Sequence, residues 1–100
     1  MPPESVEFSV APDHPALPGH FPDNPIVPGV MILDRALAPI YLEYPGGLIE
    51  VVQAKFNSPL KPGEACRIDF TVDRSGNLRF ECRSGERLVA GGLVRMERLP

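Results

Sequence analysis

Hydrophobic and polar residues alternate along two stretches in the second half of the chain. Within residues 66–73 every second residue is apolar, and the pattern resumes within residues 78–83. A period of two is typical of a strand that buries one face. The residues predicted to point inward are Cys66, Ile68, Phe70, Val72, Leu78, Phe80 and Cys82. We therefore predict two neighbouring strands of a sheet with one dry face.

A segment further upstream is apolar on nearly every side. Residues 29–41 contain only two charged side chains, Asp34 and Arg35, in a run of aliphatic residues. We predict a buried helix that weakens at Pro39, because proline lacks the backbone N–H of a helical residue, and that ends at residues 44–47. A carboxylate inside such a helix is desolvated, which predicts a raised pKa for Asp34.

The remaining patterns complete a small domain. We predict strands at residues 6–10, 48–56 and 87–96, with hairpin turns at 74–77 and 84–86. The residues of the last strand are apolar or small on both of its faces, which predicts that both faces are buried. One long helix followed by a four-strand meander, with one strand before it, favours an α+β fold in which an antiparallel sheet wraps around the helix. The chain of 100 residues is expected to form a single domain, residues 1–100.

Composition narrows the function classes. Ten basic and thirteen acidic residues give a net charge of −3, which provides no electrostatic footprint for nucleic acid. The first residues show no signal-peptide pattern, and no apolar run approaches the roughly 20 residues of a membrane span. We therefore expect a cytoplasmic protein without a nucleic-acid partner. Cys66 and Cys82 lack metal-type spacing and are interpreted as buried structural residues.

The long connection before the helix carries the candidate chemistry. Residues 13–28 contain five prolines, which restrict the backbone and would hold a side chain in a defined place. Long loops in compact domains are usually functional or disordered. His20 lies in this loop, and histidine titrates near neutral pH. The other histidine, His14, and Asn24 are interpreted as turn residues.

These motifs resemble the active-site segment of the (3R)-hydroxyacyl-acyl carrier protein dehydratases, the FabA- and FabZ-like hotdog proteins. The shared elements are His20-Phe21-Pro22, Asn24-Pro25, Pro28-Gly29-Val30 and Asp34. A second segment also resembles the family, in Ala54-Lys55-Phe56, Pro59 and Pro62-Gly63. The brevity of the chain and the His-Pro pair before LPGHFP resemble most closely the short dehydratases of aryl polyene synthesis. The resemblance implies the hotdog fold.

Elimination of water from a 3-hydroxyacyl thioester needs a base, an acid and a dipole that stabilises charge on the thioester oxygen. His20 is the candidate base, Asp34 the candidate acid, and the backbone N–H of Gly29 at the helix start the candidate dipole. The resemblance assigns the same roles to these positions. Phe21, Pro28 and Val30 are expected to complete the substrate-binding surface, and no metal or other cofactor is expected.

The same resemblance implies an acyl carrier protein as partner. It also implies a homodimer in which His20 of one subunit meets Asp34 of the other. Whether such dimers assemble further stays open. Arg35 is expected to be structural rather than to contact substrate. Two alternatives stay open: a hotdog thioesterase, and a non-catalytic partner subunit that binds acyl groups or carrier protein. Basic residues available to dock an acidic carrier are Lys55, Lys61, Arg67, Arg79, Arg83, Arg87, Arg95 and Arg98.

Overall fold

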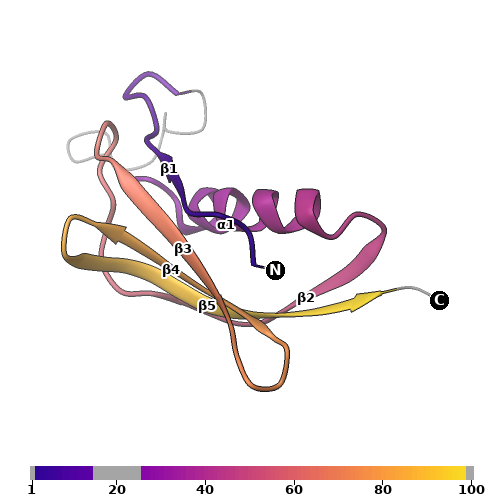
Figure 1. Cartoon of the computed structure of the whole chain (residues 1–100). Coiled ribbons are helices and arrows are strands. Elements are labelled where there is room, and N and C mark those ends of the chain that lie inside the picture. Colours follow the sequence, from indigo (N-terminus) through magenta and orange to yellow (C-terminus); the bar gives the residue numbers. More distant parts are fainter. Residues whose placement is uncertain (1, 15–25, 99–100) are drawn as a thin grey trace.

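The computed structural model describes residues 2–14 and 26–98, which form one helix and one five-stranded sheet (Figure 1). The elements in chain order are β1 (Val6–Phe8), α1 (Gly29–Glu43), β2 (Gly47–Phe56), β3 (Cys66–Val72), β4 (Leu78–Ser84) and β5 (Arg87–Arg98). Every predicted element is present, with bounds shifted by at most two residues. The α+β class is therefore confirmed.

The strand order differs from the prediction. All pairs are antiparallel, and the order across the sheet is β1-β3-β4-β5-β2. The predicted four-strand meander is wrong at β2, which pairs with β5 and lies at the edge of the sheet. Residues 57–65 connect β2 to the opposite side of the sheet, where the N–H of Gly63 donates to the carbonyl oxygen of Val10 at 2.7 Å.

The sheet curves around α1, which lies along its concave side (Figure 1). The buried face of the helix is formed by Ile32, Ala36 and Ile40, spaced one turn apart. They pack into a core with strand residues that include Ile68, Leu78, Phe80, Cys82, Val89 and Val94. The inward-facing residues of β3 and β4 match the predicted set except Val72, which is exposed.

The sequence suggested a helix that is buried on nearly every side, but the structure shows one that is buried on only one side. Val30 is 72% exposed and Leu42 is 83% exposed, so α1 presents a second apolar face to solvent. The helix also continues through Pro39 to Glu43, because a single missing N–H leaves the neighbouring turns intact. On β5 the outward-facing Leu88 and Leu93 are half-buried, so the second face of that strand is only partly covered within one chain.

The N-terminal strand is held by side chains on both of its sides. The Ser5 hydroxyl donates to Asp69 on β3, and Arg67 Nε donates to the same carboxylate at 3.0 Å. The Arg35 guanidinium lies 5.7 Å from the centre of the Phe8 ring, a cation–π contact that joins α1 to β1. This contact gives Arg35 a structural role.

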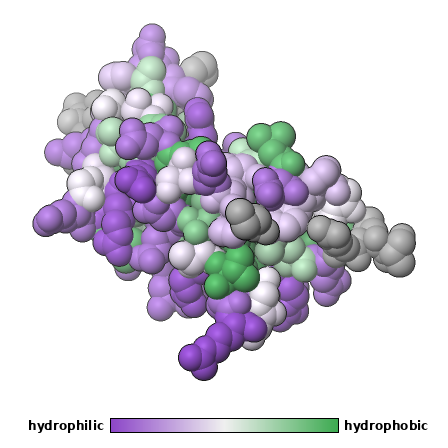
Figure 2. Space-filling view, in the orientation of Figure 1, coloured by the Kyte–Doolittle hydropathy of each residue, from purple (hydrophilic) through white to green (hydrophobic). Residues whose placement is uncertain are grey.

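One face of the molecule is mostly hydrophilic, with hydrophobic residues exposed only in separate spots (Figure 2). Within the described ranges, no helix has both the length and the apolar character needed to cross a membrane.

Candidate active site

The N-terminal end of α1 exposes backbone donors. Pro28 precedes the helix in an extended conformation (φ −58°, ψ 140°) and no side chain caps the first turn. The N–H groups of Met31 and Ile32 donate to the Pro28 carbonyl oxygen at 3.0 and 3.4 Å. Among the described residues, those of Gly29 and Val30 have no acceptor. Free N–H groups at the positive end of a helix dipole favour a negatively charged oxygen.

A cavity of about 390 Å³ opens at this end of the helix. Its lining is mainly apolar and comes from the helix start and from the segment that follows β2: Ile26, Val27, Gly29, Ile32, Phe56, Asn57, Ser58, Pro59 and Leu60. The N–H of Val27 donates to the Leu60 carbonyl oxygen at 2.7 Å, which joins the two sides of the cavity. An acyl chain is the kind of ligand that such a lining suits.

Phe56 is a residue of this site that sequence reasoning did not assign a role. A Cβ atom placed on Gly29 would lie 3.0 Å from Cε1 of the Phe56 ring. The missing side chain at Gly29 therefore makes room for the Phe56 ring. The family resemblance included Ala54-Lys55-Phe56, but the contact between β2 and the helix start does not follow from that motif.

Asp34 lies on the exposed face of α1. The prediction that burial in the helix desolvates its carboxylate is wrong for the single chain, because Asp34 is exposed. It lies two residues from both Ile32 and Ala36, about 200° around the helix from each, and therefore opposite the buried stripe. The residues that share this face at helical spacing are Val30 and Tyr41, which are exposed, and Leu37, which is half-buried.

Two of the predicted site residues, His20 and Phe21, lie outside the described residues, as does Asn24. Of the remaining predicted site residues, Pro28, Gly29 and Val30 lie together at the helix start, and Asp34 lies on the next turn. His14 has its backbone N–H bonded to the carbonyl oxygen of Ala11 at 3.0 Å, as expected of a turn residue.

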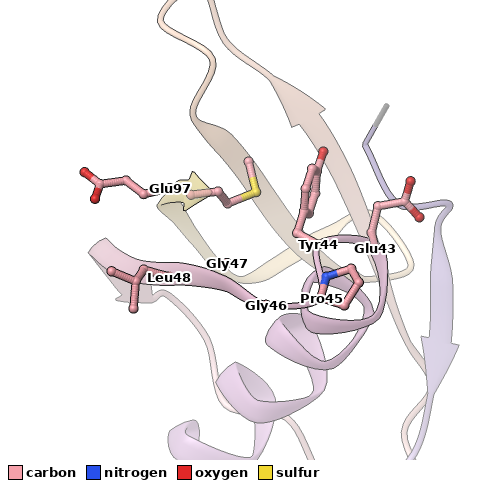
Figure 3. A pocket seen from close by; sticks show the side chains of 8 residues that line it. Glu43, Tyr44, Pro45, Gly46, Gly47, Leu48 and Glu97 are labelled. Atoms are coloured by element: carbon pink, nitrogen blue, oxygen red, sulfur yellow. The ribbon is translucent and has the colours of Figure 1, made fainter. Parts of the chain in front are cut away.

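A second cavity, of about 300 Å³, lies at the opposite end of α1 (Figure 3). Its lining includes Glu43 and Tyr44 from the helix end and Leu48 and Glu97 from β2 and β5. The Glu43 and Glu97 carboxylates point to opposite sides in Figure 3, so they do not converge on a common ligand. Within the described ranges, no group of three histidine, cysteine or acidic residues could hold a metal ion.

The two cysteines are buried neighbours on β3 and β4, as predicted. The hydrogen bond that the Cys82 thiol donates to Cys66 and the burial of Cys82 both raise the pKa of the Cys82 thiol. A neutral buried thiol is a poor nucleophile, and this agrees with a structural role.

Solved structures with similar folds place the chain in the hotdog class. The dehydratase heterocomplex ApeI:P from Xenorhabdus doucetiae aligns with a TM-score of 0.76 at 24% identity, covering 94% of this chain and 86% of that chain. A probable thioesterase from Bartonella henselae aligns with a TM-score of 0.67 at 15% identity and covers 100% of both chains. Hotdog proteins of different activity thus share this fold, so the fold does not choose between them.

The sequence itself decides the family. The family model of the ApeI-like proteins, described as ApeI dehydratase, matches residues 4–93. The chain therefore belongs to the ApeI-like dehydratase family. A curated relative, the 3-hydroxyacyl-[acyl-carrier-protein] dehydratase FabZ of Protochlamydia amoebophila (strain UWE25), is 39% identical over 85 aligned positions, which cover 76% of this chain and 51% of the relative. The chain thus spans about half the length of that relative.

Proposed function

We propose that the protein is a (3R)-3-hydroxyacyl-acyl carrier protein dehydratase that converts a 3-hydroxyacyl thioester into the trans-2-enoyl thioester in fatty acid, polyketide or aryl polyene synthesis. The observation that carries the proposal is the family match over residues 4–93. The uncapped start of α1 at the apolar cavity supports it, because this end offers both a place for an acyl chain and donors for a thioester oxygen.

In the proposed reaction, the His20 imidazole removes a proton from C2 of the substrate while the Gly29 N–H stabilises the negative charge that develops on the thioester oxygen. The C3–O bond then breaks as Asp34 gives a proton to the leaving hydroxyl, either directly or through an oriented water. Water and a C2–C3 double bond are the products, and no metal or other cofactor is needed. Phe21, Pro28 and Val30 hold the acyl thioester in place.

The proposal includes a homodimer. Asp34 is exposed in one chain, and the surrounding face of α1 is apolar. The neighbouring strand β2 is a sheet edge that exposes Leu48, Val51, Val52 and Phe56. An unpaired sheet edge can pair with another chain, and an exposed apolar patch marks an interaction site. We infer that a second copy covers this surface and that its His20 meets the Asp34 of the first copy, as the family resemblance implies.

The test is an assay of the purified chain with a 3-hydroxyacyl-acyl carrier protein, in which enoyl product and free thiol are measured separately. Enoyl formation that is lost in His20→Ala and in Asp34→Asn supports the dehydratase. Release of free thiol without enoyl product would favour the thioesterase. Absence of both products across short, long and aryl acyl chains would contradict the proposal and favour a non-catalytic partner subunit.

A further inference from the structure

Most arginines of the sheet are already paired with a carboxylate. The ion pairs of the described residues are Arg67–Asp69, Arg83–Glu81, Arg87–Glu64 and Arg95–Glu50. Lys55 on β2 and Arg79 on β4 have no ion-pair partner within the described part of the chain. Both are exposed. Their charges are therefore available to a ligand from outside.

These two cations line one hollow on the outer face of the sheet, a cavity of about 350 Å³. In the strand register Lys55 lies opposite Gly91 of β5, and Gly91 lies opposite Glu81 of β4. Arg79 lies opposite Leu93, two residues further along β5. Because Gly91 has no side chain, the floor of the hollow is formed by the backbone of β5.

The hollow carries an uncompensated positive charge although the chain has a net charge of −3. Its one acid, Glu81, is held by Arg83 at 2.9 Å. The remaining polar groups of the lining are the exposed amides of Gln53 and Asn57. Ammonium, guanidinium and amide groups are all hydrogen-bond donors, and this set suits the oxygens of a phosphate.

The hollow adjoins the candidate active site. Asn57 lines both this hollow and the cavity at the start of α1. Lys55 and Phe56 are consecutive residues, with Cα atoms about 3.8 Å apart, and successive side chains of a strand point to opposite faces. Lys55 therefore faces the hollow while Phe56 faces Gly29. A flexible substrate arm that passes over Asn57 would contact both places.

We propose that the hollow over Gly91 binds the phosphate of a phosphopantetheine arm, with Lys55 and Arg79 as its ligands, while the thioester end of the arm lies at Gly29. This inference rests on the proposed function, in which the substrate is carried on such an arm. The bare backbone at Gly91 lets the phosphate approach the sheet, and the two cations hold it from β2 and β4.

The experiment compares two substrates that differ only in the phosphate: the 3-hydroxyacyl thioesters of pantetheine and of 4′-phosphopantetheine. The wild-type chain is expected to show a lower KM for the phosphorylated substrate. Lys55→Gln and Arg79→Gln should each raise that KM by about threefold to tenfold, the range for charged contacts at partly exposed sites. The KM for the pantetheine substrate and kcat should not change.

Arg95→Gln is the matched control. It removes the same charge from the same face of the sheet, but Arg95 is already paired with Glu50 at 3.3 Å. The preference for the phosphorylated substrate should therefore survive in this variant. Gly91→Ala provides a second variant without a charge change: its added methyl would lie 3.3 Å from the Phe80 carbonyl oxygen and occupy the floor of the hollow. The same selective rise in KM is expected.

Calorimetric binding of 4′-phosphopantetheine and pantetheine separates this inference from the proposed function, because it needs no turnover. Tighter binding of the phosphorylated ligand that is lost in Lys55→Gln and Arg79→Gln supports the hollow even if the chain dehydrates nothing. Equal binding of the two ligands by the wild type would overturn it. Equal weakening of 4′-phosphopantetheine binding in Lys55→Gln, Arg79→Gln and the control Arg95→Gln would also overturn it. Equal weakening of binding to carrier proteins with and without the arm would overturn it as well, because the occupant of the hollow would then be an acidic protein surface.

Discussion

The two ends of α1 carry cavities of similar size but different chemistry. The cavity at Gly29 measures about 390 Å³ and that at Glu43 about 300 Å³. At the first end the N–H groups of Gly29 and Val30 have no acceptor among the described residues; at the second the Tyr44 N–H donates to the Ile40 carbonyl oxygen at 3.0 Å and the carboxylates diverge. The two cavities therefore differ less in volume than in the direction of the helix dipole and of the free donors, which favours the Gly29 end for a negatively charged oxygen.

The largest expected effect separates the acids at the two ends. Asp34→Asn should lower the turnover of the 3-hydroxyacyl substrate by about 10²–10⁴-fold, because the amide cannot protonate the leaving hydroxyl. Glu43→Gln at the opposite end is the matched control and should leave turnover unchanged. Steady-state rates of enoyl formation measure both. Equal losses in the two variants would remove the distinction between the ends.

The next effect concerns stability rather than chemistry. Ile40 is fully buried near the C-terminal end of α1, so Ile40→Ala should lower the free energy of unfolding by about 2–5 kcal/mol. Leu42, 83% exposed on the other side of the same turn, should cost less than about 0.5 kcal/mol when changed to alanine. Denaturant titration measures the difference. A large loss in Leu42→Ala would show that another chain covers this side of the helix.

A smaller loss is expected at Gly29. The methyl of Gly29→Ala would push against the Phe56 ring and shift the site, which should lower kcat/KM by about 10- to 100-fold. Stability should change little, because the ring is half exposed and can move. The double variant with Phe56→Leu should recover part of the loss. Full activity in Gly29→Ala alone would show that substrate does not approach this backbone closely.

The smallest effect is a pH dependence of stability that involves neither end of the helix. Hydrogen bonds from the Lys61 backbone and the Ser84 hydroxyl lower the pKa of Glu64, and the hydrogen bond from Ser5 lowers the pKa of Asp69. The folded chain thus binds these protons more weakly than the unfolded chain. The stability they contribute is fully present above the ordinary values of 4.5 and 3.8 and is lost as pH falls through the lowered values.

Because both carboxylates are partly exposed, this loss should stay below about 1 kcal/mol each. Thermal melts between pH 6 and pH 3 would measure it. Glu64→Gln should reduce the slope of the melting temperature against pH. The control is Glu86→Gln, which changes an exposed acid in the β4–β5 turn. An unchanged slope in Glu64→Gln would show that the hydrogen bonds of Glu64 add nothing to stability.

Local patterns were enough to place the secondary structure. The alternation of apolar and polar residues in β3 and β4 and the apolar run of α1 reflect how each element buries one side, and such patterns lie within a few consecutive residues. The spacing from His20 through Gly29 to Asp34 and the motif around Phe56 were enough to indicate the family. They do so because a loop that positions chemistry needs particular residues at fixed intervals.

The sequence by itself thus determined the elements, the fold class and the family of this protein. Only the tertiary structure decided that β2 pairs with β5, that the Phe56 ring lies against Gly29 and that Asp34 faces outward. It also decided that Lys55, Arg79 and Gly91 line one hollow. Each of these depends on residues far apart in the chain. Their contacts follow from how the whole core closes around one helix, which no local pattern records.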